Sequence, residues 1–361
     1  MAASPETDRR DALVERLFEA VLGFNDLHAV YLGDRLGLYS ALAGGASTPP
    51  EVAAAAGCDE RYVREWLEHQ AVGGILEVED VAAAPDERRY RIPAGHDEVL
   101  LDRDSVNYMA AFARMMVGMV QPLPQVLEAF RSGEGVPYAE FPPDFVEGQG
   151  DMNRTQFVNL LASEWLPAMP DVDERLRSGS ARVADVACGT GWSSVAIAKA
   201  YPEARVDGFD LDQGSIELAR EVASAEDVGD RVDFQVRDAA DPELTDRYDL
   251  VTVFEAVHDM ARPVEALRAI RGLLAEGGVA LVADERVADE FTAPGDEVER
   301  VMYGWSILHC LPVGRVEQPS AETGTAMRES TFRRYAEEAG FEKVEVVPIE
   351  HDFWRFYRLE A

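Results

Sequence analysis

The residues with the clearest chemical potential are two acids and a glycine turn that follow one another in the second half of the chain. Asp185 precedes the turn Cys188-Gly189-Thr190-Gly191, and Asp210 lies 21 positions after Gly189. Glycines let a backbone approach a ligand closely between a strand and its helix, and an acid about 20 residues later can bind both hydroxyls of a ribose. The turn lacks the third glycine that packs a helix against a pyrophosphate. The pattern therefore indicates a nucleoside-like ligand and does not require a diphosphate.

Strands that alternate with helices must position these residues. Helical patterns cover residues 192–201 and 215–223. Apolar runs of strand length cover residues 182–187, 206–212, 232–236, 248–253 and 279–283. Such alternation is typical of a mainly parallel sheet in an α/β domain.

The run Asp185-x-x-Cys188-Gly189-Thr190-Gly191 resembles the first motif of class I S-adenosylmethionine-dependent methyltransferases. Asp210 stands at the acid of the second strand, and Asp238-Ala239 stands at the third-strand position. The resemblance extends from residue 182 to the C-terminus. It implies an α/β fold with a Rossmann-like, seven-stranded sheet, in which residues 345–348 and 352–357 form a closing antiparallel pair.

The same resemblance implies the contacts of the expected cofactor, S-adenosylmethionine. Gly189 and Gly191 are expected at its amino-acid portion with Asp185 in support, Asp210 at the ribose, and Asp238 at the adenine amino group. Cys188 is expected to be a small turn residue, since no base stands beside it to activate a thiol. The predicted cofactor site is completed by Leu211, Ala239 and Glu255.

His258-Asp259 follow the fourth strand. This pair resembles the His-Asp pair that O-methyltransferases of the same class carry at this place, in which the pair provides the general base. Methyl transfer to a hydroxyl requires orientation of the reactants and removal of the acceptor proton. Histidine suits this task because its ordinary pKa is about 6.5. An orienting role and a structural role for His258 remain open beside that of the base.

In the same group an acid after the fifth strand holds the histidine. Asp284 and Glu285 both follow that strand, and Asp284 fits the position better, so His258, Asp259 and Asp284 form the predicted catalytic set. Which of the two acids points inward stays open, and the second supporting acid of the group has no clear counterpart. Metal-dependent methyltransferases hold a divalent ion with carboxylates near this pocket, but no third ligand accompanies Asp259 and Asp284. No metal is expected.

Ahead of this region, residues 48–92 have the outline of a winged helix. One helix begins at Thr48-Pro49-Pro50-Glu51 and ends at Gly57, and a second runs over residues 59–72. Residues 75–78 and 89–92 are predicted as two short strands around a polar turn. Residues 48–93 contain ten acids and five bases, whereas a DNA-recognition helix presents basic or amide side chains. A structural or dimerising module is favoured over nucleic-acid binding.

The two halves together resemble small-molecule O-methyltransferases of plant and polyketide-tailoring type, and a prokaryotic methyltransferase family with such a front domain. We expect residues 1–103 to be a winged-helix-like dimerisation domain, 104–177 a helical linker that caps the active site, and 178–361 the methyltransferase domain. The expected function is O-methylation of a small aromatic or polyketide-like acceptor by a homodimer. The alternatives are a cofactor-binding transcriptional regulator and different chemistry on the same fold.

Three further segments bear on the acceptor. Residues 104–131 form a methionine-rich helical stretch, which is either core or a flexible pocket lining. Residues 133–150, rich in proline and glycine, are predicted to be a connection. Within an insertion at 291–328, Tyr303, Trp305 and His309 either line an aromatic acceptor site or pack a helix onto the sheet.

The composition limits the partners. The chain of 361 residues carries 68 acidic and 34 basic side chains, a net charge of -34, and Lys199 and Lys343 are its only lysines. Such a charge repels nucleic acids. It is typical of a protein kept soluble in concentrated salt, where screening acts over about 3 Å at 1 M. A halophilic origin is therefore expected, with acid-rich composition from a GC-rich genome as the alternative.

Cysteine usage and hydropathy indicate a cytoplasmic protein. Cys58, Cys188 and Cys310 are too few and too scattered for a disulfide framework. The first ten residues lack the apolar core of a secretory signal, and no run reaches the roughly 18 apolar residues needed to span a bilayer. No membrane partner is expected.

Overall fold

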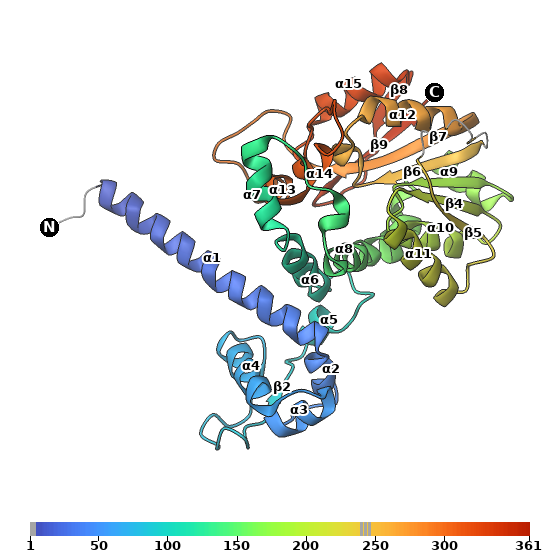
Figure 1. Cartoon of the computed structure of the whole chain (residues 1–361). Coiled ribbons are helices and arrows are strands. Elements are labelled where there is room, and N and C mark those ends of the chain that lie inside the picture. The colour runs from blue at the N-terminus through green and yellow to red at the C-terminus, as the bar shows by residue number, and fades with distance from the viewer. Residues whose placement is uncertain (1–4, 239–240, 242–243, 245–246) are drawn as a thin grey trace. The chain divides into compact units, whose positions relative to one another are not determined.

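The chain divides into two compact units, Met1–Val117 and Gly118–Ala361, in a computed structural model (Figure 1). The structure describes residues 5–238, 241, 244 and 247–361.

The first unit is mainly helical and contains the winged helix. Its two-stranded sheet is antiparallel, with Glu77 opposite Arg91 and Val78 opposite Tyr90. The predicted order of helix, turn, helix and two-stranded wing is thereby confirmed. The elements are α1 (Pro5–Arg35), α2 (Leu38–Leu42), α3 (Pro49–Ala56), α4 (Glu60–Val72), β1 (Glu77–Val78), β2 (Tyr90–Arg91) and α5 (His96–Leu100), followed by α6 (Ala110–Met119) at the division between the units.

Side-chain caps explain where α3 and α4 begin. The backbone N–H of Thr48 donates to Glu51 Oε2 at 2.8 Å, in a capping box that fixes the first turn of α3. Asp59 caps α4 by accepting from the backbone N–H groups of Arg61 at 3.0 Å and Tyr62 at 3.2 Å. The buried side of α4 carries Trp66, whose Nε1 donates to the carbonyl of Ala29 at 2.8 Å and so ties α4 to α1.

The second unit contains one sheet of seven strands in the order β5-β4-β3-β6-β7-β9-β8. All pairings are parallel except those of β9, which runs antiparallel to β7 and β8. The predicted seven-stranded α/β fold, with its closing antiparallel pair, is confirmed. The strands are β3 (Arg182–Val186), β4 (Arg205–Asp210), β5 (Val232–Val236), β6 (Tyr248–Phe254), β7 (Leu274–Glu285), β8 (Lys343–Val346) and β9 (Trp354–Glu360).

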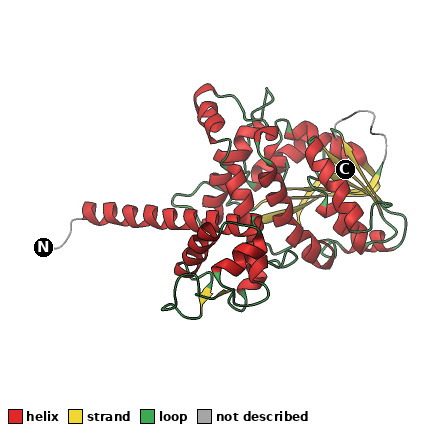
Figure 2. Cartoon of the chain, turned by 60° about the horizontal axis from the view of Figure 1, so that its bottom comes forward, coloured by secondary structure: helices red, strands yellow, loops and turns green. Residues whose placement is uncertain are grey.

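Helices cover both faces of this sheet (Figure 2). One face packs against α9, α10, α11 and η2, and the other packs against α12 and α15. The remaining elements lie in the connections. The bounds of the helices are α7 (Leu123–Ser132), η1 (Tyr138–Glu140), α8 (Pro143–Gln156), η2 (Phe157–Trp165), α9 (Pro170–Arg177), α10 (Trp192–Ala200), α11 (Gln213–Ala225), η3 (Val257–Asp259), α12 (Pro263–Leu273), α13 (Glu297–Trp305), η4 (Ser306–Cys310), α14 (Leu311–Gly314) and α15 (Glu329–Ala339).

The prediction that residues 133–150 form a connection is wrong for its second half. The short helix η1 lies in it, and α8 begins at Pro143 and continues into the π-helix η2. Pro143 occupies the first turn, where its missing N–H costs nothing. Gly148 and Gly150 lie inside the helix, and Gly150 packs directly against the side chain of Thr190 in the glycine turn. A close helix crossing, rather than a loop, accounts for these glycines.

The turn after β3 depends on glycine at position 191. Gly191 has a φ of 80°, in the left-handed region, and begins α10 as its N-cap. A Cβ atom there would lie 2.6 Å from Cζ of Phe234 and 2.8 Å from Cβ of Ala219. Only glycine satisfies both the backbone and the close approach.

Among the described residues, the helices are all too short or too polar to serve as a membrane span.

We predict that Gly191→Ala lowers the free energy of unfolding by on the order of 1–3 kcal/mol, because alanine strains both the left-handed backbone and the contact with Phe234. Chemical denaturation measures this loss. Gly272→Ala is the matched control: Gly272 lies in α12 with nothing within 4 Å of an added Cβ. Alanine there should stabilise by about 0.5–1 kcal/mol. Equal stability of the two variants would contradict the role of Gly191.

Candidate active site

Asp185 is a buried anchor below the glycine turn. Its Oδ2 accepts from the hydroxyls of Ser193 at 2.5 Å and Ser194 at 2.6 Å, and its Oδ1 accepts from Thr252 Oγ1 at 2.8 Å. Burial raises its pKa, and the three hydroxyl donors oppose that rise. The carboxyl group thus joins the end of β3 to the first turn of α10 and to β6. Its role in the structure is to hold the turn in place from beneath.

Asp210, at the end of β4, holds the same turn from the side. Its Oδ2 accepts from the backbone N–H of Gly189 at 2.8 Å, and its Oδ1 accepts from the N–H of Asp212 at 2.9 Å. Each oxygen keeps a further lone pair for a ligand. Burial raises the pKa of Asp210, while these backbone donors favour its charged form. The predicted ribose residue is therefore part of the wall of the glycine turn.

The other predicted cofactor residues are spread over neighbouring strand ends. Leu211 is 70% exposed beside Asp210, and Asp238 is exposed after β5. Ala239 lies outside the described residues. Glu255 follows β6, and its two carboxylate oxygens are taken by Asn153 Nδ2 at 2.5 Å and by Trp354 Nε1 at 2.8 Å. The backbone of Glu255 has an unusual positive φ of 52°.

Cys188 behaves as a turn residue in this surrounding. Burial and the charges of Asp185 and Asp210 raise the pKa of its thiol well above the ordinary value. A thiol that stays protonated is a poor nucleophile.

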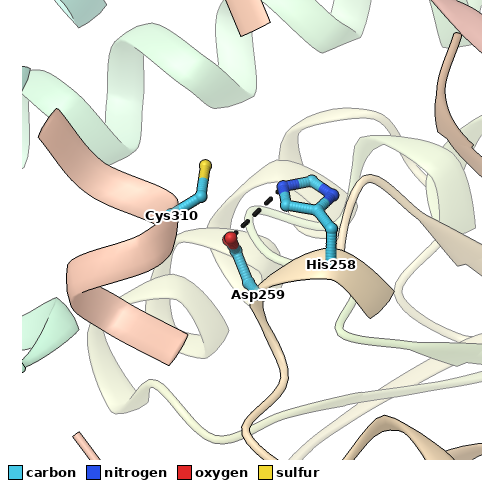
Figure 3. Close-up of side chains that lie close together, drawn as sticks. All are labelled: His258, Asp259 and Cys310. Atoms are coloured by element: carbon cyan, nitrogen blue, oxygen red, sulfur yellow. Dashed lines mark ion pairs between the residues drawn. The ribbon is translucent and has the colours of Figure 1, made fainter. Parts of the chain in front are cut away.

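His258 lies between two carboxylates, those of Asp284 and of Asp259, and Figure 3 shows its ion pair with Asp259. Its Nδ1 is 2.7 Å from Asp284 Oδ1, and its Nε2 is 3.2 Å from Asp259 Oδ1. His258 and Asp284 are almost completely buried, whereas 22% of the Asp259 side chain is exposed. Of the two acids after β7, Asp284 is the one that contacts the ring. The three predicted catalytic residues are brought together, with Nε2 on the more accessible side.

The two carboxylates determine the charge of the ring. Burial alone would lower the pKa of His258, but the charges of Asp259 and Asp284 outweigh burial and raise the pKa well above its ordinary value. Burial likewise opposes ionisation of Asp259, and the His258 charge reverses this and lowers its pKa. Both effects favour the charged imidazole, with a carboxylate beside either nitrogen.

Two further glutamates enlarge this acidic group. Burial raises the pKa of Glu285 well above its ordinary value, and the neighbouring Glu255 adds to the effect. Burial also raises the pKa of Glu255. Glu285 Oε2 and Asp284 Oδ2 have no hydrogen-bond partner among the described residues.

The π-helix η4 brings His309 and Cys310 to the same place. The Nδ1 of His309 is 3.5 Å from Cys310 Sγ, and both residues are buried. Consecutive residues of an α-helix point about 100° apart, and the wider π turn places both inward. Among the described residues, His258, Asp259 and Cys310 are the group whose potential metal-ligand atoms lie within 4.8 Å of one another. The direct ion pair between His258 and Asp259 already accounts for two of these three side chains (Figure 3).

Aromatic rings surround His309 and were missed from the sequence. Phe145, Phe141 and Tyr138 have ring centroids 4.4, 4.5 and 5.8 Å from that of His309. All three belong to the stretch predicted as a connection, although the spacing of Phe141 and Phe145 by four residues, on either side of Pro142-Pro143, was an available helix signal. Of the three aromatic candidates in the insertion, Tyr303 is 39% exposed and Trp305 is half-buried, so His309 alone is buried in this group.

Tyr138 connects the two halves of the site. Burial, with the nearby charges of Asp210, Asp212 and Asp259, raises the pKa of its hydroxyl. The residue is thus close to the acids of the glycine-turn side and to the acid that contacts His258. A ligand at Asp210 and a ligand at His258 would be neighbours.

The described geometry is that of a methyltransferase fold with a glycine turn on one side and a histidine between carboxylates on the other. Residues 177–340 match the family model described as "Methyltransferase domain". Residues 28–103 match the model described as "Rv2258c-like winged HTH domain". The chain thus combines a winged-helix domain with a methyltransferase domain.

Similar proteins and structures agree with this architecture. The ubiquinone biosynthesis O-methyltransferase of Marinobacter nauticus is 31% identical over 111 residues, which are 30% of this chain and 45% of that protein. The structure of the mitomycin 7-O-methyltransferase MmcR superposes with a TM-score of 0.69 at 19% identity, over 98% of this chain and 100% of that one. Human N-acetylserotonin methyltransferase in complex with SAM superposes with a TM-score of 0.65 at 18% identity, over 100% of this chain and 99% of that one.

The curated relatives are matched only in part. Aligned stretches cover 24%, 38% and 45% of three of them, so the chain spans less than half of their length. The structural likenesses establish the fold.

We predict that Asp259→Asn lowers the pKa of His258, because one of the two carboxylates that stabilise the imidazolium loses its charge. NMR titration of the ring protons measures the change. Asp230→Asn, which alters an exposed ion pair with Arg231, is the control and should leave that pKa unchanged. An unaltered His258 titration in Asp259→Asn would refute the assigned cause.

The raised pKa also fixes the direction of the stability effect. The ion pairs of His258 stabilise the fold fully below its unfolded pKa of about 6.5, and this contribution is lost as the pH rises through the folded pKa.

Proposed function

We propose that the protein is an S-adenosylmethionine-dependent methyltransferase that methylates a hydroxyl of a small aromatic or polyketide-like acceptor. The observation that carries this proposal is that two groups follow neighbouring strands of one sheet, in the order β4-β3-β6-β7. One is the glycine turn walled by Asp210, and the other is the buried His258 between Asp259 and Asp284. The O-methyltransferase names of similar proteins support it.

The residues around the glycine turn fit such a cofactor. Gly189 leaves partly exposed backbone with open space beside it, and Gly191 lets the turn pack closely against Phe234. Asp210 offers two carboxylate oxygens for hydroxyls, and Asp185 holds the turn from below. S-adenosylmethionine supplies, when bound, a methyl group on a sulfonium that is already a good leaving group. The protein must therefore align the acceptor and take its proton.

His258 is suited to take that proton at Nε2. Asp284 holds Nδ1 and so fixes the ring, and Asp259 occupies the side of Nε2 where an acceptor hydroxyl must arrive. Because the pKa of His258 is raised, the neutral base becomes more abundant as the pH rises. Turnover should therefore increase with pH on the acid side of that pKa.

The regulator alternative is disfavoured by the winged helix itself. The five arginines of residues 48–93 each pair with a carboxylate, as in Arg64 with Asp86 at 2.6 Å and Arg91 with Glu77 at 2.6 Å. A DNA-binding surface needs free cations for phosphates. This module offers paired ones, which fits a structural role.

A homodimer is part of the proposal. The helix α1 carries exposed apolar side chains along much of its length, and exposed apolar patches of this kind mark association surfaces. A second copy of the chain would cover them. They are Leu13, Val14, Leu17, Phe18, Val21, Leu22 and Phe24.

Asp210→Ala should weaken binding of S-adenosylmethionine at least about tenfold, because two hydrogen bonds to a charged group are lost. Isothermal titration calorimetry measures the affinity, and Asp230→Ala at an exposed position is the matched control. Unchanged affinity in Asp210→Ala would place the cofactor elsewhere.

His258→Ala should reduce methyl transfer by about 10²–10⁴-fold while leaving cofactor affinity intact. Mass spectrometry of extracts incubated with labelled cofactor detects the product and identifies the acceptor. His28→Ala, at a half-buried histidine of α1, is the control. Full turnover in His258→Ala would remove the general-base role.

A further inference from the structure

His309 is a buried polar side chain to which the proposed chemistry assigns no role. It is 2% exposed, and its Nε2 has no hydrogen-bond partner among the described residues. Leaving a buried polar atom unpaired costs about 1–3 kcal/mol. Such an atom at the edge of an active site indicates a partner that arrives with the substrate.

The position of His309 places it near His258. Cys310 Sγ lies within 4.8 Å of ligand atoms of both His258 and Asp259, and His309 Nδ1 is 3.5 Å from the same sulfur. Both imidazoles therefore adjoin one sulfur atom. Because Nδ1 of His309 faces the thiol of Cys310, Nε2 is the ring nitrogen that remains for a ligand.

The surroundings of His309 are aromatic. Phe145, Phe141 and Tyr138 pack around the imidazole with centroid distances of 4.4 to 5.8 Å. Aromatic side chains favour stacked or edge contacts with a planar ring. A planar aromatic compound that reaches His309 Nε2 therefore meets side chains suited to such contacts.

The charges define its polarity. Burial lowers the pKa of His309 to about 4, so its ring is neutral near pH 7 and cannot balance an anion. His258 is already paired with Asp259 and Asp284, and Glu285 adds a further buried carboxyl group. The strongest electrostatic influences on His258, Asp259 and His309 come from carboxyl, imidazole and thiol groups. An acceptor with its own carboxylate would meet repulsion here, whereas hydroxyls would find hydrogen-bond acceptors.

We propose that the acceptor is an uncharged arene with at least two hydroxyl groups, one placed at His258 for methylation and the other bound by His309. His309 then determines specificity and does not take part in the methyl transfer. The inference rests on the proposed function, since it describes the acceptor of the same site.

The test uses the full chain saturated with S-adenosylhomocysteine, so that binding is measured without turnover. Three matched naphthalenes serve as probes: one with two adjacent hydroxyls, one with a single hydroxyl, and one with a carboxylate in place of the second hydroxyl. Calorimetry should show that the dihydroxy compound binds roughly fivefold to tenfold more tightly than the single-hydroxyl compound, as expected for one hydrogen bond. The carboxylate compound should bind most weakly.

Variants at one position separate the hydrogen bond from packing. His309→Phe should abolish the preference for the second hydroxyl while still binding the single-hydroxyl compound. His309→Gln, which keeps a polar side chain, should restore part of the preference, and Cys310→Ala should retain it. Circular dichroism establishes that each variant is folded.

Methyl transfer is assayed separately, which distinguishes the two proposals. His309-dependent binding of the dihydroxy compound without any methylated product would leave this inference standing and defeat the proposed function. Methylation with equal preference for all three probes, or a preference that survives His309→Phe, would overturn the inference and leave the proposed function. Binding of none of the three probes would also overturn it.

Discussion

The carboxyl group of Asp185 is the contact on which the arrangement of the site depends. Its oxygens accept from hydroxyls of α10 and β6, so one buried side chain fixes a strand end, a helix start and a neighbouring strand. Burying a carboxylate is costly unless donors compensate, and three hydroxyls do so here. Because Asp185 supports the turn from below, Gly189 and Gly191 need no side chains to hold the turn in place. That freedom lets Gly189 be held from the side by Asp210 and leaves backbone exposed to a ligand.

The same principle operates with opposite sign around His258. There the buried group is an imidazole, and Asp259 and Asp284 compensate its charged form. Because the carboxyl ends of parallel strands meet at one edge, acids that follow β6 and end β7 converge on a single ring. Their combined charge raises the pKa of His258 and so favours its protonated form. The fraction of His258 in its neutral, basic form therefore depends on the pH and on any group that displaces Asp259 from Nε2.

The sequence was sufficient for the sheet because the apolar strands are buried on both faces, which makes their runs continuous. It was sufficient for the winged helix because Thr48 and Asp59 are caps with local partners. It failed at α8, where glycines needed for a close crossing with Thr190 look like loop residues. The contacts of His258 with Asp259 and Asp284 were expected from the resemblance, because each acid follows a predicted strand. The use of Glu255 by Asn153 and Trp354 joins residues far apart in the chain, so no local pattern reveals it.

The π-helix η4 has a consequence for how specificity can change over time. A π turn contains one residue more than an α turn, so the inward placement of both His309 and Cys310 depends on the length of residues 306–310. Loss of a single residue would restore α-helical register and turn a different pair of side chains toward His258. A one-codon deletion could therefore exchange the acceptor-facing chemistry in one step, while leaving the glycine turn, Asp185 and the sheet unaltered.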